Sequence, residues 1–362
     1  MALEDIPGQE RAAALLRAAL RSGRLAHAYL FVGPSGMGRL AMARELASVL
    51  LCPEGGAQPF GDAQGKACGA CKSCRSLESG NHPDYYEAGV PEGKQELPIA
   101  LVQMLQDRAA VKPFMAPRRV FVVKDAERMN QEAANCFLKT LEEPPGGSCF
   151  ILIAAGLWDM PQTVVSRCRV VKFTGLPPGR VEEVLRGDGL DAEDAWWLAR
   201  RSWGSPGLAV GFKHIGLHSA NRELAEKLLA LSAADGLALR PAEAYGLTDW
   251  LSARADDAAQ SRPQARAALQ ELLECAAVFY RDLAALAIAP GEAEVFNRGL
   301  EERLRELASR CSVESLIECA DRVFDAIERV GANANRQVAL DDLFSQLSVI
   351  SDHCRIGGAE PS

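Results

Sequence analysis

The chain has 362 residues, of which 48% are hydrophobic and 24% charged, and its formal net charge is −8. This length predicts two or three domains, and the acidic balance argues against a generally basic nucleic-acid coat. No apolar run approaches the roughly 20 residues that span a bilayer, and the first residues lack a secretion-signal pattern. We therefore expect a cytoplasmic protein with no membrane partner, whose eleven cysteines are mostly reduced.

Up to about Thr174, short β-rich runs alternate with helical segments, which predicts a parallel sheet with helices on both faces. The strand candidates are Ala28–Val32, Val120–Lys124, Cys149–Ala154 and Arg169–Phe173. A helix is expected over Leu40–Leu51, directly after the first strand. Asn130 is a suitable N-cap for another helix, which Pro144-Pro145-Gly146-Gly147 would end.

A degenerate phosphate-binding loop lies between the first strand and its helix. The segment Gly33-Pro34-Ser35-Gly36-Met37-Gly38-Arg39-Leu40 keeps the glycine spacing of G-x-x-x-x-G-K-[ST]. Gly33, Gly36 and Gly38 would let backbone N–H groups curl around an anion. Arg39, however, replaces the lysine, and Leu40 replaces the magnesium-binding hydroxyl. The fold of a nucleotide hydrolase is predicted without its catalysis, and ATP or ADP binding is doubtful.

Four cysteines have the spacing of a metal site. Cys68-x-x-Cys71-x-x-Cys74 lies in a Gly/Lys-rich loop, and Cys52 ends the preceding helix. These thiols can close a tetrahedral zinc site, and four thiolates leave no open position for water. We therefore expect one structural zinc ion. Free thiols, a redox pair and an iron–sulfur cluster are the alternatives, the last requiring redox logic seen nowhere else in the sequence.

Catalytic groups are also missing from two later strand ends. The strand at Val120–Lys124 is followed by Asp125, a candidate magnesium ligand, but then by Ala126 where many ATPases carry a glutamate that activates water. The strand that ends at Ala154 and Ala155 offers no hydroxyl or amide to sense a γ-phosphate. Together with the altered loop, these losses predict that the chain hydrolyses no ATP.

The remaining sequence predicts only helices. Leu176-Pro177-Pro178-Gly179 breaks the earlier pattern, and short helices are expected at Val181–Arg186, Ala192–Arg201 and Gly207–Lys213. From Ser219 to His353 the chain is Ala/Leu-rich and helical, with breaks at Arg240-Pro241, Arg262-Pro263 and Ala289-Pro290-Gly291. Two apolar stripes predict a helical core. They comprise Leu269, Leu272, Leu273, Ala276 and Tyr280, and Leu316, Ala320, Val323, Phe324 and Ile327.

Several motifs together resemble the AAA+ clamp-loader subunits of bacterial DNA polymerase III, most closely the delta-prime branch. They include His27 to Pro34, the four cysteines, Asn135 to Pro145, Ser166-Arg167-Cys168 and Gly204-Ser205-Pro206-Gly207. The resemblance covers about residues 6–210. It implies an α/β AAA+ core over 1–174, followed by an all-α lid over 175–217 and an all-α collar for oligomerisation over 218–355. A disordered tail is expected over 356–362.

The resemblance also implies how the chain works. In that family the S-R-C arginine reaches a neighbouring subunit's ATP site, so Arg167 is expected to be an arginine finger in trans, with Ser166 shaping the helix end. The expected partners are the gamma/tau and delta subunits within the DNA polymerase III holoenzyme, the sliding clamp and primer–template DNA. Leu208 stands where active relatives often carry a nucleotide-contacting arginine.

Two other functions stay open at this point. One is an active AAA+ ATPase of the gamma/tau type in which Arg39 substitutes for lysine, against which Ala126 argues. The other is a DNA-binding module that uses the cysteine loop as a zinc finger. The acidic net charge and the lack of a basic recognition helix near Cys74 count against it.

Overall fold

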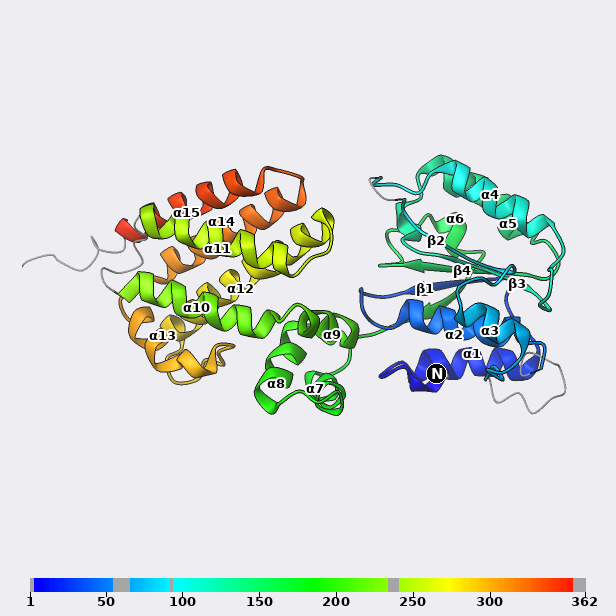
Figure 1. Ribbon diagram of the computed structural model, residues 1–362, viewed down its shortest axis with the longest axis horizontal. Helices are drawn as coiled ribbons and strands as arrows, with labels where there is room; N and C mark the ends of the chain where they lie inside the picture. The colour runs from blue at the N-terminus through cyan, green and yellow to red at the C-terminus, as the bar shows by residue number, and fades with distance from the viewer. Residues whose placement is uncertain (1–2, 55–65, 92–93, 234–240, 354–362) are drawn as a thin grey trace, which may run out of the picture. The chain divides into compact units, whose positions relative to one another are not determined.

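The computed structural model describes residues 3–54, 66–91, 94–233 and 241–353 (Figure 1). The chain divides into two compact units, residues 1–210 and 211–362. The division does not test the domain borders predicted at 174/175 and 217/218, which remain predictions. The predicted tail at 356–362 and most of the loop between Cys52 and Cys68 lie outside the described residues.

Five parallel strands form one sheet in the first unit, in the order β2-β3-β4-β1-β5. The strands are β1 (Ala28–Val32), β2 (Tyr85–Ala88), β3 (Arg119–Val123), β4 (Ser148–Ala154) and β5 (Arg169–Lys172). β1 is central, with Leu30 opposite Leu152 of β4 and Val170 of β5. The four predicted strands are confirmed to within one residue at each end.

The fifth strand, β2, is not among the predicted strands because its sequence lacks a buried apolar run. Its four residues are all half-buried, and Glu87 interrupts the pattern. The Glu87 carboxylate accepts two hydrogen bonds from Arg44, both at 2.9 Å, and one from the Tyr85 hydroxyl at 2.9 Å. An edge strand pairs on one side only, so a short and partly polar segment can complete the sheet.

Helices cover both faces of the sheet, as predicted (Figure 1). One face carries α1 (Glu10–Ser22), α2 (Arg39–Leu51) and α3 (Lys72–Glu78), and the other carries α4 (Ile99–Ala110) and α5 (Gln131–Glu142). Side chains alternate along each strand, so Tyr29 and Phe31 pack into the core beneath α1 and α2 while Leu30 packs beneath α4 and α5. Phe121 and Phe150 stack in the second core at 4.8 Å between ring centroids.

The predicted start of α5 is confirmed. The Asn130 side chain accepts a hydrogen bond from the backbone N–H of Ala133 at 2.9 Å, which satisfies one free donor of the first helical turn. The helix ends at Glu142, just before the prolines. The first unit also contains four further short elements, and more helices follow them along the chain. The four short elements are the 3₁₀ turns η1 (Leu3–Asp5) and η2 (Ala126–Arg128) and the helices α6 (Gln162–Val165) and α7 (Pro178–Gly187).

The predicted short helices after the sheet are confirmed as α7, α8 (Ala192–Arg201) and α9 (Pro206–His214). The described part of the second unit is also helical, as predicted. Its elements are α10 (Leu217–Ala233), α11 (Pro241–Asp257), α12 (Arg262–Ile288), η3 (Arg298–Leu300), α13 (Glu301–Ala308), α14 (Val313–Gly331) and α15 (Arg336–His353). Helices begin or end at the predicted breaks, although Arg240 lies outside the described residues. None of the described helices is long and apolar enough to cross a membrane.

One predicted core position in the second unit is wrong. The stripe on α12 is buried as expected, but Phe324 on α14 is 53% exposed. α14 instead buries residues spaced three or four apart, namely Leu316, Cys319, Val323, Ala326 and Val330. Phe324 follows Val323 by one residue and is therefore turned about 100° away from that face.

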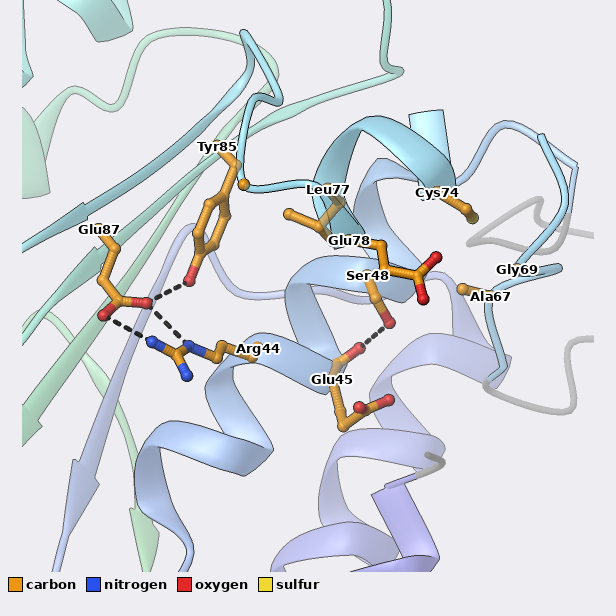
Figure 2. Close-up of a pocket in the computed structure, with 11 residues that line it drawn as sticks. Arg44, Glu45, Ser48, Ala67, Gly69, Cys74, Leu77, Glu78, Tyr85 and Glu87 are labelled. Carbon is orange, nitrogen blue, oxygen red and sulfur yellow. Dashed lines mark hydrogen bonds and ion pairs between the residues drawn. The ribbon is translucent and has the colours of Figure 1, made fainter. Parts of the chain in front are cut away.

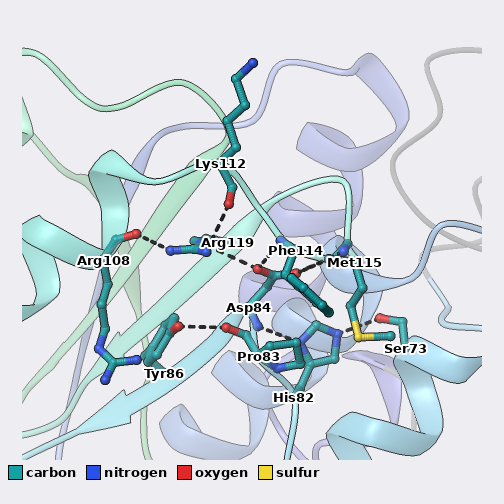
Figure 3. A network of polar contacts seen from close by, with 11 residues as sticks. Ser73, His82, Pro83, Asp84, Tyr86, Arg108, Lys112, Phe114, Met115 and Arg119 are labelled. Atoms are coloured by element: carbon teal, nitrogen blue, oxygen red, sulfur yellow. Dashed lines mark hydrogen bonds and ion pairs between the residues drawn. The ribbon is translucent and has the colours of Figure 1, made fainter.

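A buried carboxylate joins the starts of β2 and β3. Asp84, which is fully buried, accepts hydrogen bonds from three backbone N–H groups of the loop before β3 and from Arg119 Nε at 3.2 Å (Figure 3). The three N–H groups belong to Phe114, Met115 and Ala116, at 2.7–3.0 Å. Burial alone would raise the pKa of Asp84, but these bonds and the Arg119 charge outweigh it, so the pKa lies below its ordinary value.

We predict that Asp84→Ala lowers the free energy of unfolding by about 3–5 kcal/mol, because it leaves Arg119 and three backbone donors without their acceptor. Chemical denaturation of the purified chain measures this loss. Asp107→Ala, at an exposed position on α4, is the control and should change stability little.

The loss of unfolding free energy in Asp84→Ala should become smaller as the pH falls. A carboxylate with a lowered folded-state pKa stabilises the fold above its unfolded value of about 3.9, and this contribution disappears as pH falls through the folded value. The difference between the native chain and Asp84→Ala should therefore be constant near neutral pH and shrink below about pH 4. A gap that widens on acidification would contradict this account.

Candidate functional site

The degenerate phosphate loop opens α2 at the carboxyl end of β1. Gly33 follows Val32 directly, and Gly38 caps α2 with a positive φ of 82°. Because the strands are parallel, the segments that follow β3 and β4 reach the same edge of the sheet. The predicted loop residues Gly33, Gly36, Gly38 and Arg39 thus lie together where an α/β fold ordinarily binds ligands.

Arg39 bonds to the protein's own main chain. Its Nη1 donates a hydrogen bond to the carbonyl oxygen of Ala154, the last residue of β4. The backbone N–H of Gly33 donates to the same oxygen at 3.4 Å. Burial lowers the pKa of Arg39, an effect opposed by nearby Glu127 and Asp125. Arg39, which in a working phosphate loop would face a phosphate, thus bonds to β4 instead. Together with the Gly33 N–H, it ties both ends of the loop to the Ala154 carbonyl.

The start of α9 packs directly on the loop. The backbone N–H of Gly207 donates to the Gly36 carbonyl at 3.0 Å, and Ser205 Oγ donates to the Ser35 carbonyl at 3.1 Å. A Cβ on Gly36, whose φ is +72°, would collide with Ser205 Oγ, and one on Gly207 would lie 2.6 Å from the Gly36 carbonyl oxygen. Both glycines are needed for this close approach, and Leu208 lies beside it.

The segment after β3 carries Ala126 at the position where many ATPases have a glutamate, although Asp125 and Glu127 lie near Arg39. Asp125 has a left-handed backbone, with φ 53°, and turns the chain into η2. Ala126 is completely buried, and Glu127 follows only after this turn. Leu40 packs against the core beneath α1 and α2. Of the positions expected to bind magnesium or activate water, Leu40 and Ala126 thus carry apolar side chains, whereas Asp125 keeps its carboxylate.

The four predicted cysteine ligands lie together. Sγ atoms of Cys52, Cys68, Cys71 and Cys74 are all within 4.8 Å of one another, and the Cys68–Cys74 separation is 3.9 Å. A tetrahedral ion with metal–sulfur bonds of about 2.3 Å places its ligands about 3.8 Å apart, so the group fits one ion. Burial and the hydrogen bond with Cys71 raise the pKa of the Cys74 thiol to about 12. A cation is thus needed to hold this cluster ionised.

Backbone N–H groups support the same cluster. Cys68 N donates to Cys52 Sγ at 3.4 Å, Cys71 N to Cys68 Sγ at 3.3 Å and Cys74 N to Cys71 Sγ at 3.4 Å. Such donors stabilise sulfur ligands that carry negative charge. Each of these donors is the main-chain N–H of one of the cysteines themselves.

A polar chain connects the cysteine helix α3 to the Asp84 network (Figure 3). His82 Nδ1 accepts a hydrogen bond from Asp84 N at 3.0 Å, so the neutral ring carries its proton on Nε2. Nε2 lies 2.7 Å from Ser73 Oγ, which itself donates to the Leu51 carbonyl at 2.7 Å. Burial lowers the pKa of His82, which favours this neutral form. The cysteine module is thereby joined to the base of the sheet.

A groove of about 740 Å³ opens between α2, β2 and the cysteine module (Figure 2). Several of its polar groups bond to one another. Arg44 and the Tyr85 hydroxyl both bond to Glu87, and Ser48 Oγ donates to the Glu45 carbonyl at 2.8 Å. Despite burial, which opposes ionisation, these bonds lower the pKa of Glu87 to about 2. The carboxylate is ionised throughout the neutral range and cannot serve there as a general acid.

Arg167 and Ser166 lie at the end of α6. Ser166 is the C-cap, and its hydroxyl donates to the Thr163 carbonyl at 3.1 Å. The Arg167 side chain is 33% exposed and forms an ion pair with Glu142 of α5. Glu142 is not among the predicted site residues. An acidic residue at a helix C-terminus lies at the unfavourable end of the helix dipole, so a nearby cation would be expected to compensate for it. This position is the signal in the sequence that could have pointed to Glu142.

Comparison with known proteins matches residues 8–177 to the family described as "DNA polymerase III, delta subunit". DNA polymerase III subunit delta' of Escherichia coli K12 is 31% identical over 335 residues, which cover 92% of each chain. The delta' subunit of Bacillus subtilis is 35% identical over 177 residues, or 49% of this chain and about half (51%) of the relative. A gamma/tau subunit of Mycobacterium tuberculosis is 33% identical over 208 residues, or 56% of this chain and 35% of the relative.

We predict that the purified chain carries one equivalent of tightly bound metal, measured by elemental mass spectrometry. Cys74→Ser should lower the metal content and the melting temperature together, because three thiolates hold the ion less tightly and the cluster supports α3. Cys136→Ser, outside the cluster, is the matched control. Metal content that Cys74→Ser leaves unchanged would exclude this site.

Proposed function

The chain belongs to the family of DNA polymerase III delta' subunits, and we propose that it is a clamp-loader subunit that hydrolyses no ATP itself. The observation that carries this proposal is the Arg39 guanidinium bonded to the Ala154 carbonyl. A phosphate-loop lysine must face the β- and γ-phosphates, and a neighbouring hydroxyl must bind magnesium. Here the cation is engaged by the main chain, and Leu40 supplies no oxygen.

We further propose that Arg167 completes the ATP site of an adjacent subunit. An arginine supplied in trans stabilises the charge that develops on the transferring phosphoryl group. Arg167 follows a four-residue helix and is one-third exposed, which suits a side chain that must reach another subunit. A subunit without hydrolysis of its own can thus be required for hydrolysis next to it.

The proposed partners are the gamma/tau and delta subunits, the sliding clamp and primer–template DNA. We assign structural zinc to the four cysteines, since the sulfur separations suit a tetrahedral ion and four ligands leave no open position for water. The helix within this module, Lys72–Glu78, is short and carries acidic as well as basic residues. It therefore supports a structural module rather than a DNA-reading zinc finger.

An active ATPase of the gamma/tau type is the competing function, favoured by the similarity to a gamma/tau subunit. Three features oppose it. Arg39 is engaged with Ala154, Ala126 is buried without a carboxylate, and Leu208 replaces a cation beside the loop. The two functions differ in whether the isolated chain binds and turns over ATP.

We predict that the isolated chain shows no saturable Mg-ATP binding up to about 1 mM, which corresponds to less than roughly 4 kcal/mol of binding free energy. Isothermal titration calorimetry and a turnover assay of the chain alone measure this directly. Micromolar binding with turnover would favour the ATPase of the gamma/tau type instead.

We predict that Arg167→Ala lowers DNA-stimulated ATP turnover by the reconstituted clamp loader. The ATP site served by this residue should lose on the order of 10³-fold in rate, while the other sites of the complex set the residual turnover. Single-turnover measurements separate the two contributions. Arg186→Ala, an exposed arginine on α7, is the control for loss of surface charge. Turnover equal to that of the native complex would remove Arg167 from the mechanism.

A further inference from the structure

We infer that Glu142 is a positioning residue for Arg167, an inference that rests on the proposed function of Arg167 as a finger in trans. The two residues come from different elements, since Glu142 ends α5 and Arg167 follows α6. Their ion pair joins the Arg167 side chain to α5, whereas its other side-chain hydrogen bonds stay within the α6 turn. Glu142 therefore decides where the guanidinium points before a neighbour's ATP arrives.

Three acceptors fix the guanidinium from two sides. Nη1 donates to the Thr163 carbonyl at 2.9 Å and to Ser166 Oγ at 3.3 Å, both in the same turn of the chain. Nη2 donates to Glu142 Oε1. Contacts from α6 alone would leave the group free to swing about its Nη1 edge. The carboxylate on the other edge fixes the guanidinium plane.

The arrangement leaves donors for a phosphate. A guanidinium has five N–H donors, and the three contacts use both on Nη1 and one on Nη2. Within the described part of the chain, the Nε–H and the second Nη2–H have no hydrogen-bond partner. The side chain is 33% exposed, and that of Glu142 is 50% exposed, so an anion can approach from outside. Arg167 is held and still able to bind.

Holding the side chain matters because arginine is long and flexible. A finger that samples many rotamers loses conformational freedom each time it binds the transition state, and one already ordered does not. The cost of immobilising one such side chain corresponds to about a two- to tenfold change in rate. This range is the expected effect of removing the carboxylate.

A competing role for Glu142 predicts the opposite change in the rate of ATP hydrolysis. If the carboxylate competed with the neighbour's phosphate for Arg167, its removal would free the guanidinium and raise the rate. Glutamine separates charge from geometry, because its amide oxygen still accepts a hydrogen bond from Nη2 without a negative charge. Glu143, the exposed C-cap of α5, provides a matched control for loss of one carboxylate at the same helix end.

The experiment measures kcat and KM for ATP in the reconstituted clamp loader, with assembly and melting temperature checked for each variant. Glu142→Ala should lower kcat about two- to tenfold, with a smaller change in KM. Glu142→Gln should retain most of the rate, and Glu143→Ala all of it. In the Arg167→Ala background, Glu142→Ala should have no further effect, because no finger remains to be positioned.

The outcomes separate the two proposals. If Arg167→Ala lowers turnover while Glu142→Ala does not, or while Glu142→Ala acts equally in both backgrounds, Glu142 does not position the finger. A rate increased by Glu142→Ala would show competition and overturn the inference in the same way. If Arg167→Ala leaves turnover unchanged, the finger itself is wrong, and the inference falls with it.

Discussion

The buried Asp84 carboxylate is the constraint on which the α/β unit depends. It holds the loop before β3, the start of β2 and Arg119 at one point inside the fold. Through Arg119 it also reaches the end of α4, where the Arg108 carbonyl accepts a hydrogen bond. β2 and β3 are parallel and begin here, and β3 in turn pairs in register with β4. The Asp84 network lies at the amino ends of the strands, and the phosphate loop lies at their carboxyl ends. By fixing where β2 and β3 begin, the network helps to set the positions of the segments near the loop.

At the carboxyl ends of the strands, the cation and two carbonyls of the phosphate loop bond to other parts of the protein. In a nucleotide hydrolase, groups at these positions would face the nucleotide. Ala154, Gly207 and Ser205 satisfy the loop's cation and two of its carbonyls. Arg167 differs, because it keeps unused donors while its other contacts are made. This contrast between Arg39 and Arg167 agrees with the roles we propose for them, Arg39 maintaining the loop and Arg167 acting on a neighbouring subunit.

Local sequence patterns predicted the parts of this structure that depend on local chemistry. Asn130 caps α5 because the bond it makes spans only three residues, and the predicted strands are continuous apolar runs. Local patterns predicted neither the strand β2 nor the contact made by Glu142. Glu87 bonds to Arg44, which lies 43 positions earlier in the chain, and Glu142 contacts Arg167, which lies 25 positions later. Phe324 belongs to a run of apolar residues at helical spacing that predicts a core face, but the residues that α14 buries follow Val323 and not Phe324.

The proposed absence of ATP hydrolysis depends on several positions at once, and Arg39 illustrates this. A lysine at this position would give up the guanidinium bond to Ala154 before any phosphate is available to replace it. A hydroxyl in place of Leu40 would remove an apolar side chain from the core beneath α2, with no magnesium to compensate. Leu208 would still offer no positive charge, and Ala126 no base. If the chain hydrolyses no ATP, as we propose, each of these changes taken alone would remove an existing contact without supplying the other groups, so an active site would require several changes at once.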